Sequence, residues 1–271
     1  MSILQNKYNA PIGIFDSGMG GLTVMQSIKK CMPNEKVIYF GDTAHLPYGD
    51  KSKETLIKYS LDIVNFFLEK KAKAIVVACN SATSNAWDEI VKRVGNKAFV
   101  FNVIDPVINK VAFELHSNIG VIATQATINS KFYNKKLRKL NRHIKVSTLA
   151  TPLLVPIIEE GLAKSEIAKV TLEYYLTNKA LQNIDSLILG CTHYPIIYNQ
   201  VNHFYQGKIN IIDSPLIVAN DIKYQLSKNN LLNNHPISEQ DLFYVSDYTK
   251  HFENMTKNFF GKKINLEQLS L

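Results

Sequence analysis

The sequence predicts an α/β protein made of two similar lobes, each with a mainly parallel sheet, and a cleft between them. Short apolar runs alternate with amphipathic segments along the 271 residues, a pattern typical of parallel sheets covered by helices. Two segments of the first half recur in the second half at similar spacing. No stretch rich in glycine and serine separates the halves, so we expect the lobes to pack face to face.

The expected strands are continuous apolar runs, as is usual for strands covered on both faces. They are Ile12–Phe15, Val37–Phe40, Ala74–Ala78, Phe99–Val103, Ile119–Ile122, Val146–Leu149, Leu187–Leu189 and Ile209–Ile212. The segments between them carry apolar residues at helical spacing. The expected helices are Leu22–Cys31, Lys53–Lys71, Ala82–Val94, Pro106–Leu115, Ser165–Asn178 and Pro215–Leu226.

The internal repeat is visible in two places. Residues 12–15 (IGIF) are echoed by residues 119–122 (IGVI), and residues 75–81 (IVVACNS) by residues 187–193 (LILGCTH). Apolar strands resemble one another, so one match could be chance, but two matches in the same order indicate two lobes of similar topology.

Two cysteines end repeat-related strands. Cys79 is followed by Asn80-Ser81, and Cys191 is followed by Thr192-His193. We expect each thiol where a helix begins, a position that lowers a thiol pKa and favours the thiolate. If the lobes face each other, the two sulfurs do so across the cleft. Such a pair can remove a proton from one face of a stereocentre and return one to the other face.

A glycine-rich turn, Asp16–Gly21, follows the first strand. Backbone N–H groups at such a turn suit an anion. The turn is not a dinucleotide fingerprint, because Thr23 stands where a further glycine is required, and it lacks the Gly-Lys-Ser/Thr of a P-loop. A carbanion at Cα needs N–H groups and hydroxyls fixed around the carboxylate. The polar residues of that kind are Ser17, Asn80, Ser81 and Thr192.

The remaining composition narrows the choice of function. Lys and Arg number 31 against 23 Asp and Glu, but the positive charge is scattered. Its densest stretch, residues 135–145, has no interleaved Phe, Tyr or Trp, so we do not expect nucleic-acid binding. An odd count of three cysteines argues against a disulfide framework, and the lack of a CxxC pair argues against structural zinc. The third cysteine, Cys31, lies in the first helix with no polar cluster near it, and we interpret it as structural.

We expect no membrane span and no signal peptide. No stretch approaches the ~18 consecutive apolar residues of a membrane helix, and residues 1–10 contain no apolar core typical of a signal. The expected location is therefore the cytoplasm.

Taken together, these motifs resemble those of the glutamate racemase family. The matching segments keep the family's order and lie at residues 12–21, 41–49, 78–82, 152–161 and 187–195. The resemblance implies two lobes with a flavodoxin-like arrangement. It further implies that residues 1–103 and 213–271 form the first lobe and residues 104–212 the second.

The resemblance also implies residue roles. Cys79 and Cys191 would be the two acid/base residues, the first acting on D-glutamate and the second on L-glutamate. Asp16 would assist Cys79, while His193 and Glu159 would assist Cys191. The implied substrate contacts are Asp16, Ser17, Tyr48, Gly49, Asn80, Ser81, Thr192 and His193. The family makes D-glutamate for peptidoglycan, uses neither pyridoxal phosphate nor metal, and commonly forms dimers. We therefore expect glutamate as substrate, no cofactor, and a homodimer.

Three positions depart from the family pattern. Ser81 replaces the usual Thr and keeps a hydroxyl, so we expect little change. Thr151 stands where a non-catalytic Cys is usual, and Asp105 stands where Glu or Gln is usual. Little sequence precedes the first strand, so the precursor activation of some members is not expected.

Two other functions stay open at this point. One is a racemase of the same superfamily that acts on aspartate or hydantoins, although the DSGxGG and CTHYP segments favour glutamate. The other is a non-catalytic α/β module that binds nucleic acid through its basic surface. Salt-dependent DNA binding without amino-acid turnover would support the second.

Overall fold

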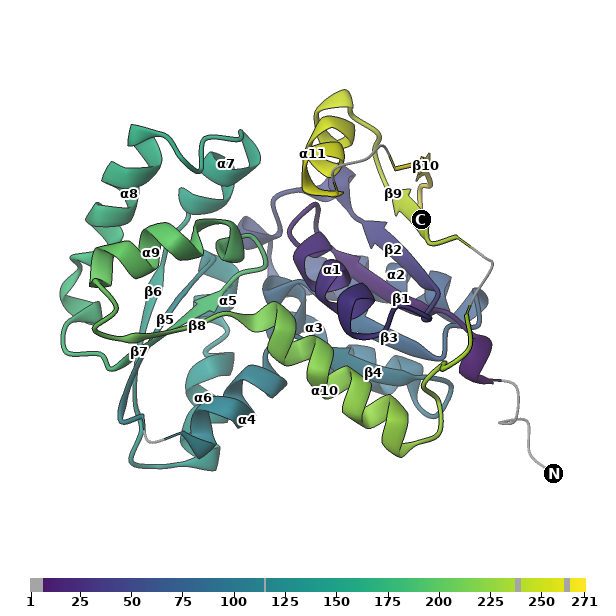
Figure 1. The fold of residues 1–271 in the computed structure, drawn as a ribbon, viewed down its shortest axis with the longest axis horizontal. Coiled ribbons are helices and arrows are strands. Elements are labelled where there is room, and N and C mark those ends of the chain that lie inside the picture. Colours follow the sequence, from purple (N-terminus) through teal and green to yellow (C-terminus); the bar gives the residue numbers. More distant parts are fainter. Residues whose placement is uncertain (1–6, 115, 237–239, 261–263) are drawn as a thin grey trace.

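A computed structural model describes residues 7–114, 116–236, 240–260 and 264–271. Figure 1 shows two sheets side by side, each covered by helices. The first sheet has the strand order β10-β9-β2-β1-β3-β4 and the second the order β6-β5-β7-β8. All strand pairs among the described residues are parallel. The prediction of two lobes with mainly parallel sheets is confirmed.

The elements have the following bounds. The first sheet contains β1 (Ile12–Asp16), β2 (Val37–Gly41), β3 (Ala74–Val77), β4 (Phe99–Asn102), β9 (Leu242–Val245) and β10 (Leu266–Gln268). The second sheet contains β5 (Asn118–Ala123), β6 (Lys145–Ala150), β7 (Ser186–Gly190) and β8 (Asn210–Ile212). The helices are α1 (Leu22–Cys31), α2 (Lys53–Glu69), α3 (Asn80–Val94), α4 (Asp105–Phe113), α5 (Gln125–Asn129), α6 (Phe132–Leu140), α7 (Leu154–Glu159), α8 (Glu166–Leu176), α9 (Tyr198–Tyr205), α10 (Ser214–Lys228) and α11 (Lys250–Phe260). Short 3₁₀ turns are η1 (Lys7–Asn9), η2 (Thr43–His45), η3 (Tyr48–Asp50), η4 (Lys179–Leu181) and η5 (Tyr194–Ile197).

Local sequence explains where these elements lie. The strands β1, β2, β3 and β7 are buried at every position, which is why they appear as unbroken apolar runs. Helix α2 begins after Ser52, whose hydroxyl accepts from the backbone N–H of Thr55. Helix α4 has Pro106 in its first turn, where no backbone donor is needed.

The predicted strands β1 to β8 and six predicted helices are all present, with ends shifted by at most a few residues. The helix predicted for Pro106–Leu115 runs from Asp105 to Phe113, and Leu115 itself lies outside the described residues, as do residues 1–6. The elements that the sequence did not predict are β9, β10, α5, α6, α7, α9 and α11.

The internal repeat is confirmed by the sheet topology. When β1 to β4 are matched with β5 to β8, both sheets have the order second, first, third, fourth. This is the flavodoxin-like order, in which ligands bind beyond the strand ends where the order reverses. Cys79 follows β3 and Cys191 follows β7, so the two thiols occupy equivalent places.

The largest apolar cluster of the described residues spans both lobes. Buried residues of the first sheet, such as Ile14 and Val76, belong to the same cluster as Val121 and Ile188 of the second. Helix α10 follows the second sheet and packs on α1 of the first lobe. We propose that the lobes divide as residues 1–103 with 213–271 and residues 104–212, because β9 and β10 join the first sheet.

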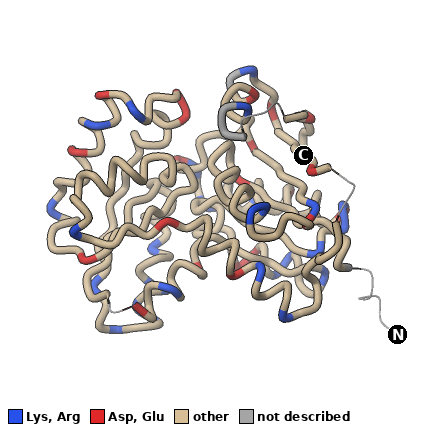
Figure 2. Tube along the Cα trace, viewed as in Figure 1, with Lys and Arg blue, Asp and Glu red and all other residues tan. Residues whose placement is uncertain are grey.

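Charge is distributed over the whole molecule. In the view of Figure 2, Lys and Arg occur on both lobes and are interspersed with Asp and Glu. Among the described residues, no helix has the length and apolar character needed to cross a membrane.

Candidate active site

The ends of two pairs of equivalent strands meet at one pocket. Ser17 follows β1, Cys79 follows β3, Thr124 follows β5 and Cys191 follows β7, and all four residues line the pocket. The structure therefore brings both predicted thiols into one pocket formed by loops of both lobes. The other predicted residues that line it are Tyr48, Gly49, Asn80, Ser81, Thr192 and His193.

Cys79 is buried at the N-terminus of α3. Burial and then the charge of Asp16 raise the pKa of its thiol to about 12, while hydrogen bonds from the Ala82 and Ser81 backbones lower it by less. The prediction of a lowered pKa is wrong for Cys79, because removal from water outweighs the helix N-terminus. Cys79 therefore holds its proton, and its Sγ lies 4.0 Å from Ser17 Oγ.

Cys191 is not followed directly by an α-helix. The 3₁₀ turn η5 begins at Tyr194, and α9 begins only at Tyr198. The prediction that both thiols sit at the start of a helix is thus correct for Cys79 only. The charge beside Cys191 comes instead from a side chain, His193.

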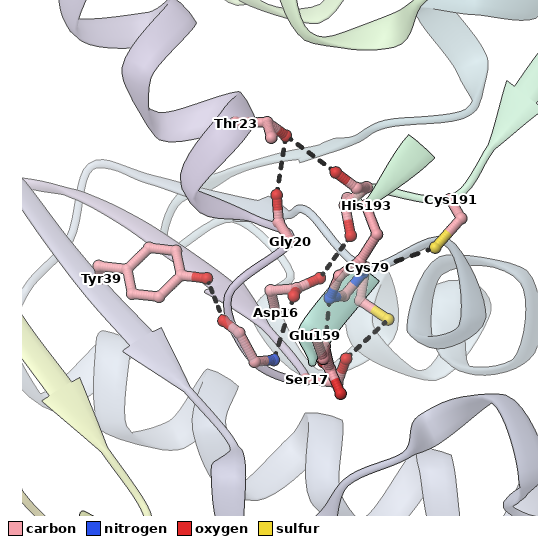
Figure 3. A network of polar contacts seen from close by, with 11 residues as sticks. Asp16, Ser17, Gly20, Thr23, Tyr39, Cys79, Glu159, Cys191 and His193 are labelled. Carbon is pink, nitrogen blue, oxygen red and sulfur yellow. Dashed lines mark hydrogen bonds and ion pairs between the residues drawn. The ribbon is translucent and has the colours of Figure 1, made fainter. Parts of the chain in front are cut away.

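His193 connects Cys191 to Glu159 (Figure 3). Its Nδ1 lies 3.7 Å from Cys191 Sγ, and its Nε2 lies 3.0 Å from Glu159 Oε1. Burial lowers the pKa of His193, but hydrogen bonds and charges from Cys191 and Glu159 raise it by more, so that it ends well above its usual value. The raised pKa favours the imidazolium form, which carries a proton on each ring nitrogen. Glu159 is therefore connected to Cys191 through the imidazole of His193.

Asp16 lies fully buried behind the turn that follows β1. Its Oδ1 accepts from the backbone N–H of Gly18 at 3.1 Å, and its Oδ2 accepts from the hydroxyl of Thr192 at 3.2 Å. Asp16 is close enough to Cys79 for its charge to raise that thiol's pKa. Its hydrogen bonds, however, hold the two loops rather than the sulfur.

Gly20 allows the loops of the two lobes to contact each other. A Cβ at this position would lie 2.3 Å from Thr192 Oγ1 and 2.5 Å from His193 Nδ1, distances that no side chain tolerates. The glycine is therefore required by close approach between the lobes, in addition to any role in exposing backbone N–H groups.

Tyr48 and Gly49 form another wall of the pocket. The Tyr48 hydroxyl donates to Asp42 Oδ2 at 2.5 Å, and Asp42 also lies 2.9 Å from His45 Nδ1. Asp42 is a supporting residue that the sequence reasoning missed, although it lies within the matching segment 41–49.

Asn80 and Ser81 are both held from the second lobe. Ser81 Oγ lies 2.8 Å from Thr124 Oγ1, and the Tyr133 hydroxyl donates to Asn80 Oδ1 at 2.8 Å. The prediction missed Thr124. The repeat contained a signal for it, because Thr124 follows β5 as Ser17 follows β1. The further pocket residues that were not predicted are Leu46, Pro47, Asp50, Gln125, Pro152, Val155 and Pro156.

The three departures from the family pattern have structural accounts. Ser81 keeps its hydroxyl contact with Thr124. Thr151 is buried with its Oγ1 2.6 Å from the Tyr194 hydroxyl, and Asp105 pairs with Lys136 of α6 at 2.9 Å.

Within the described residues, no group of three or more His, Cys, Asp or Glu side chains could hold a metal ion.

The chain is similar to known racemases over nearly its whole length. A sequence profile of the Asp/Glu/Hydantoin racemase family matches residues 12–222. A glutamate racemase of Geobacter metallireducens is 39% identical over 264 residues, which cover 96% of each chain. The crystal structure of glutamate racemase from Francisella tularensis in complex with D-glutamate matches with a TM-score of 0.91 and 36% identity, covering 97% of this chain and 98% of that one. The chain therefore belongs to the Asp/Glu/Hydantoin racemase family.

Aspartate racemases share the fold more distantly. The aspartate racemase of Picrophilus torridus matches with a TM-score of 0.57 and 20% identity, covering 82% of this chain and 99% of that one. This likeness shows the fold alone.

Proposed function

We propose that this chain interconverts L- and D-glutamate by proton transfer at Cα between two cysteines. The observation that carries the proposal is that Cys79 and Cys191 follow equivalent strands of the two lobes and line one pocket. Relatives that match the chain almost from end to end are glutamate racemases, and a solved relative binds D-glutamate. The cysteine pair supports the proposed reaction, and the relatives support glutamate as the proposed substrate.

The proposed reaction needs one base and one acid on opposite faces of Cα. On L-glutamate, Cys191 removes the Cα proton, and the electron pair of the C–H bond stays on the substrate as a carbanion. Cys79 then breaks its S–H bond and supplies the proton from the other face, which gives D-glutamate. The raised pKa of Cys79 fits this direction, because the thiol enters the reaction protonated. The reverse reaction exchanges the two roles.

Three further residues assist these transfers in the proposal. Protonated His193 places positive charge beside Cys191 when that sulfur is negative, and Glu159 keeps His193 protonated. Asp16 disfavours a thiolate at Cys79, so it keeps this thiol protonated before the reaction with L-glutamate and makes its thiolate a stronger base in the reverse reaction. Asp16 also fixes the loops on which Gly18 and Thr192 lie.

Polar groups around the pocket bind the substrate and its carbanionic state. N–H groups and hydroxyls fixed before the reaction stabilise charge that develops on the α-carboxylate. The proposed direct contacts, which the family resemblance also names, are Ser17, Tyr48, Gly49, Asn80, Ser81, Thr192 and His193. Asp16, the remaining residue that the resemblance names, is fully buried and acts through its hydrogen bonds to Gly18 and Thr192. The two thiols supply both proton transfers, so the proposal includes no cofactor and no metal.

The family resemblance extends the proposal to the cell. We propose that the D-glutamate produced is used for peptidoglycan synthesis, that the protein acts in the cytoplasm, and that it functions as a homodimer. These statements rest on the family resemblance alone.

Circular dichroism of L-glutamate incubated with purified protein tests the function. We expect the optical signal to decay to zero with nothing else added, with a chelator present, and after dialysis. L-aspartate and a hydantoin serve as comparison substrates, and turnover of either at the expense of glutamate would reassign the substrate. Salt-dependent DNA binding without turnover of any amino acid would overturn the enzyme assignment.

A further inference from the structure

One polar atom of the pocket is buried without a partner. The Nδ2 amide of Asn80 has no hydrogen-bond partner among the described residues, although Asn80 is nearly fully buried. Leaving a buried donor unpaired costs free energy, so such an atom calls for an explanation. Asn80 lines the same pocket as the two cysteines, where an acceptor on the substrate can complete the hydrogen bond.

The other end of the same amide is occupied. Tyr133 donates its hydroxyl to Asn80 Oδ1 at 2.8 Å. A side-chain amide has a donor end and an acceptor end, so an amide whose acceptor end is occupied has its donor end left to pair with a ligand. With Oδ1 held by Tyr133, Nδ2 is the end of the amide that is left without a partner in this pocket residue. The reversed amide would present an oxygen, which repels a carboxylate.

We propose that Tyr133 is a positioning residue that holds the Asn80 amide with its donor toward a carboxylate of the substrate. The inference rests on the proposed function, since it assumes a dicarboxylate in the pocket. Tyr133 does not line the pocket itself and acts only through Asn80.

Tyr133 is well suited to this task because its own position is fixed. Its side chain is 2% exposed and packs in the apolar cluster that spans both lobes. Burial, followed by the charges of Cys191 and Asp105, raises the pKa of its hydroxyl, which therefore remains a donor throughout the physiological range. Helix α6, which carries Tyr133, is tied to the start of α4 by the Lys136–Asp105 pair at 2.9 Å.

The contact also crosses between the lobes. Asn80 begins helix α3, which follows β3 of the first sheet, and Tyr133 belongs to helix α6, which lies between β5 and β6 of the second. The neighbouring Ser81 is held in the same way by Thr124. The orientation of the residues after Cys79 is thus set by side chains of the opposite lobe.

A double-mutant cycle on glutamate turnover tests the proposal. Tyr133→Phe keeps the ring and removes only the hydroxyl, so we expect KM to rise about 10-fold while kcat changes less, because a carboxylate contact is made in ground state and transition state alike. Asn80→Ala should raise KM at least as much. In the double variant, Tyr133→Phe should add nothing, because its effect passes through Asn80. Equal effects of Tyr133→Phe with and without Asn80, or an unchanged KM in Tyr133→Phe, would overturn the proposal.

A matched control and a second readout complete the test. Tyr205→Phe removes another buried hydroxyl of the second lobe, one outside the pocket, and should leave KM and kcat unchanged. Thermal melting establishes that each variant is folded. NMR of the Asn80 side-chain amide, identified by its loss in Asn80→Ala, should show shifted signals in substrate-free Tyr133→Phe. Unshifted signals would count against the proposal even if glutamate were not the substrate, so this readout separates its failure from failure of the proposed function.

Discussion

The hydroxyl of Thr192 donates to Asp16 with Oγ1 3.2 Å from Oδ2, and this hydrogen bond joins the two lobes beside the pocket. Thr192 follows Cys191 in the second lobe, while Asp16 ends the first strand of the first lobe. The contact from Tyr133 to Asn80 is its counterpart in the opposite direction. Each lobe therefore orients the residue that follows the other lobe's cysteine, so the pocket is complete only when the lobes are docked.

Replacement of either pocket cysteine should nearly stop racemisation. We expect Cys79→Ser and Cys191→Ser each to lower kcat by at least about 100-fold, because general acid–base catalysis by a positioned group contributes about 10²–10⁴-fold and a serine hydroxyl is a far weaker acid than a thiol. Circular dichroism of L- and D-glutamate measures the rates. Cys31→Ser is the control, since Cys31 is half-buried on α1 beside Asn220, and it should keep near-normal turnover. Strong loss of activity in a folded Cys31→Ser would show that the catalytic pair is misassigned.

Deuterium labelling should distinguish two bases from one. In D₂O, L-glutamate gives its proton to Cys191, and the opposite face receives deuterium from Cys79. At low conversion, the D-glutamate formed should carry deuterium at Cα, while recovered L-glutamate should carry little. Proton NMR of the separated enantiomers measures both. Protium-rich D-glutamate, after correction for slow thiol exchange, would contradict transfer by a pair on opposite faces.

Glu159→Gln should move the alkaline limb of the pH profile to lower pH. The Glu159 carboxylate raises the pKa of His193, so its loss lowers that pKa and depletes the imidazolium at a lower pH. The measurement is kcat/KM against pH. Because the equilibrium constant of a racemisation is unity, kcat/KM must shift equally for both enantiomers, which is an internal check. Glu160→Gln is the matched control, because Glu160 is exposed next to Glu159. An alkaline limb that does not move in Glu159→Gln would rule out this role.

Lys73→Met should destabilise the fold without reaching the pocket. Lys73 Nζ lies 2.6 Å from Glu35 Oε2, and both side chains are almost fully buried. The ammonium also donates to the backbone oxygen of Leu231 at 2.8 Å. Loss of Lys73 leaves a buried carboxylate without its cation, which costs about 3–5 kcal/mol.

Urea unfolding measures this cost as a drop in the free energy of unfolding. Adding Glu35→Gln to Lys73→Met should recover much of the stability, because the uncompensated charge is then gone. A loss below about 1 kcal/mol in Lys73→Met would mean that the pair is dispensable. A double variant no more stable than Lys73→Met would locate the cost elsewhere.

The main strands were predictable for a physical reason. Strands buried on both faces must be apolar at every position, so β1 to β3 and β7 stood out as unbroken runs. The edge strand β10 (Leu266–Gln268) is short and partly polar, and it carried no such signal. Helix α6 was not predicted for two reasons. Its lysines were interpreted as part of a charge run, and its buried residues are only Tyr133 and Leu137, too few to form a clear apolar stripe.

The sequence allowed the main residues of the site to be predicted, but not their pKa values or the contacts between the lobes. Motif spacing and the repeat placed Cys79, Cys191 and His193 together, and the structure brings them to one pocket. The pKa of Cys79 depends on burial and on Asp16, which lies far away in the sequence. Likewise, the contact of Tyr133 with Asn80 depends on how the lobes dock, and no local pattern reports it.

The strand order has a consequence for synthesis on the ribosome. The second sheet uses only residues 118–212, whereas the first sheet takes β9 and β10 from residues 242–268 and places β9 against β2. All strands of the second sheet therefore leave the exit tunnel before the first sheet can be completed. During that interval β2 is an open edge, which can pair with strands of other chains. A chain stopped between residues 230 and 240 would keep this edge permanently and would be prone to aggregate, even though every pocket cysteine had already been made.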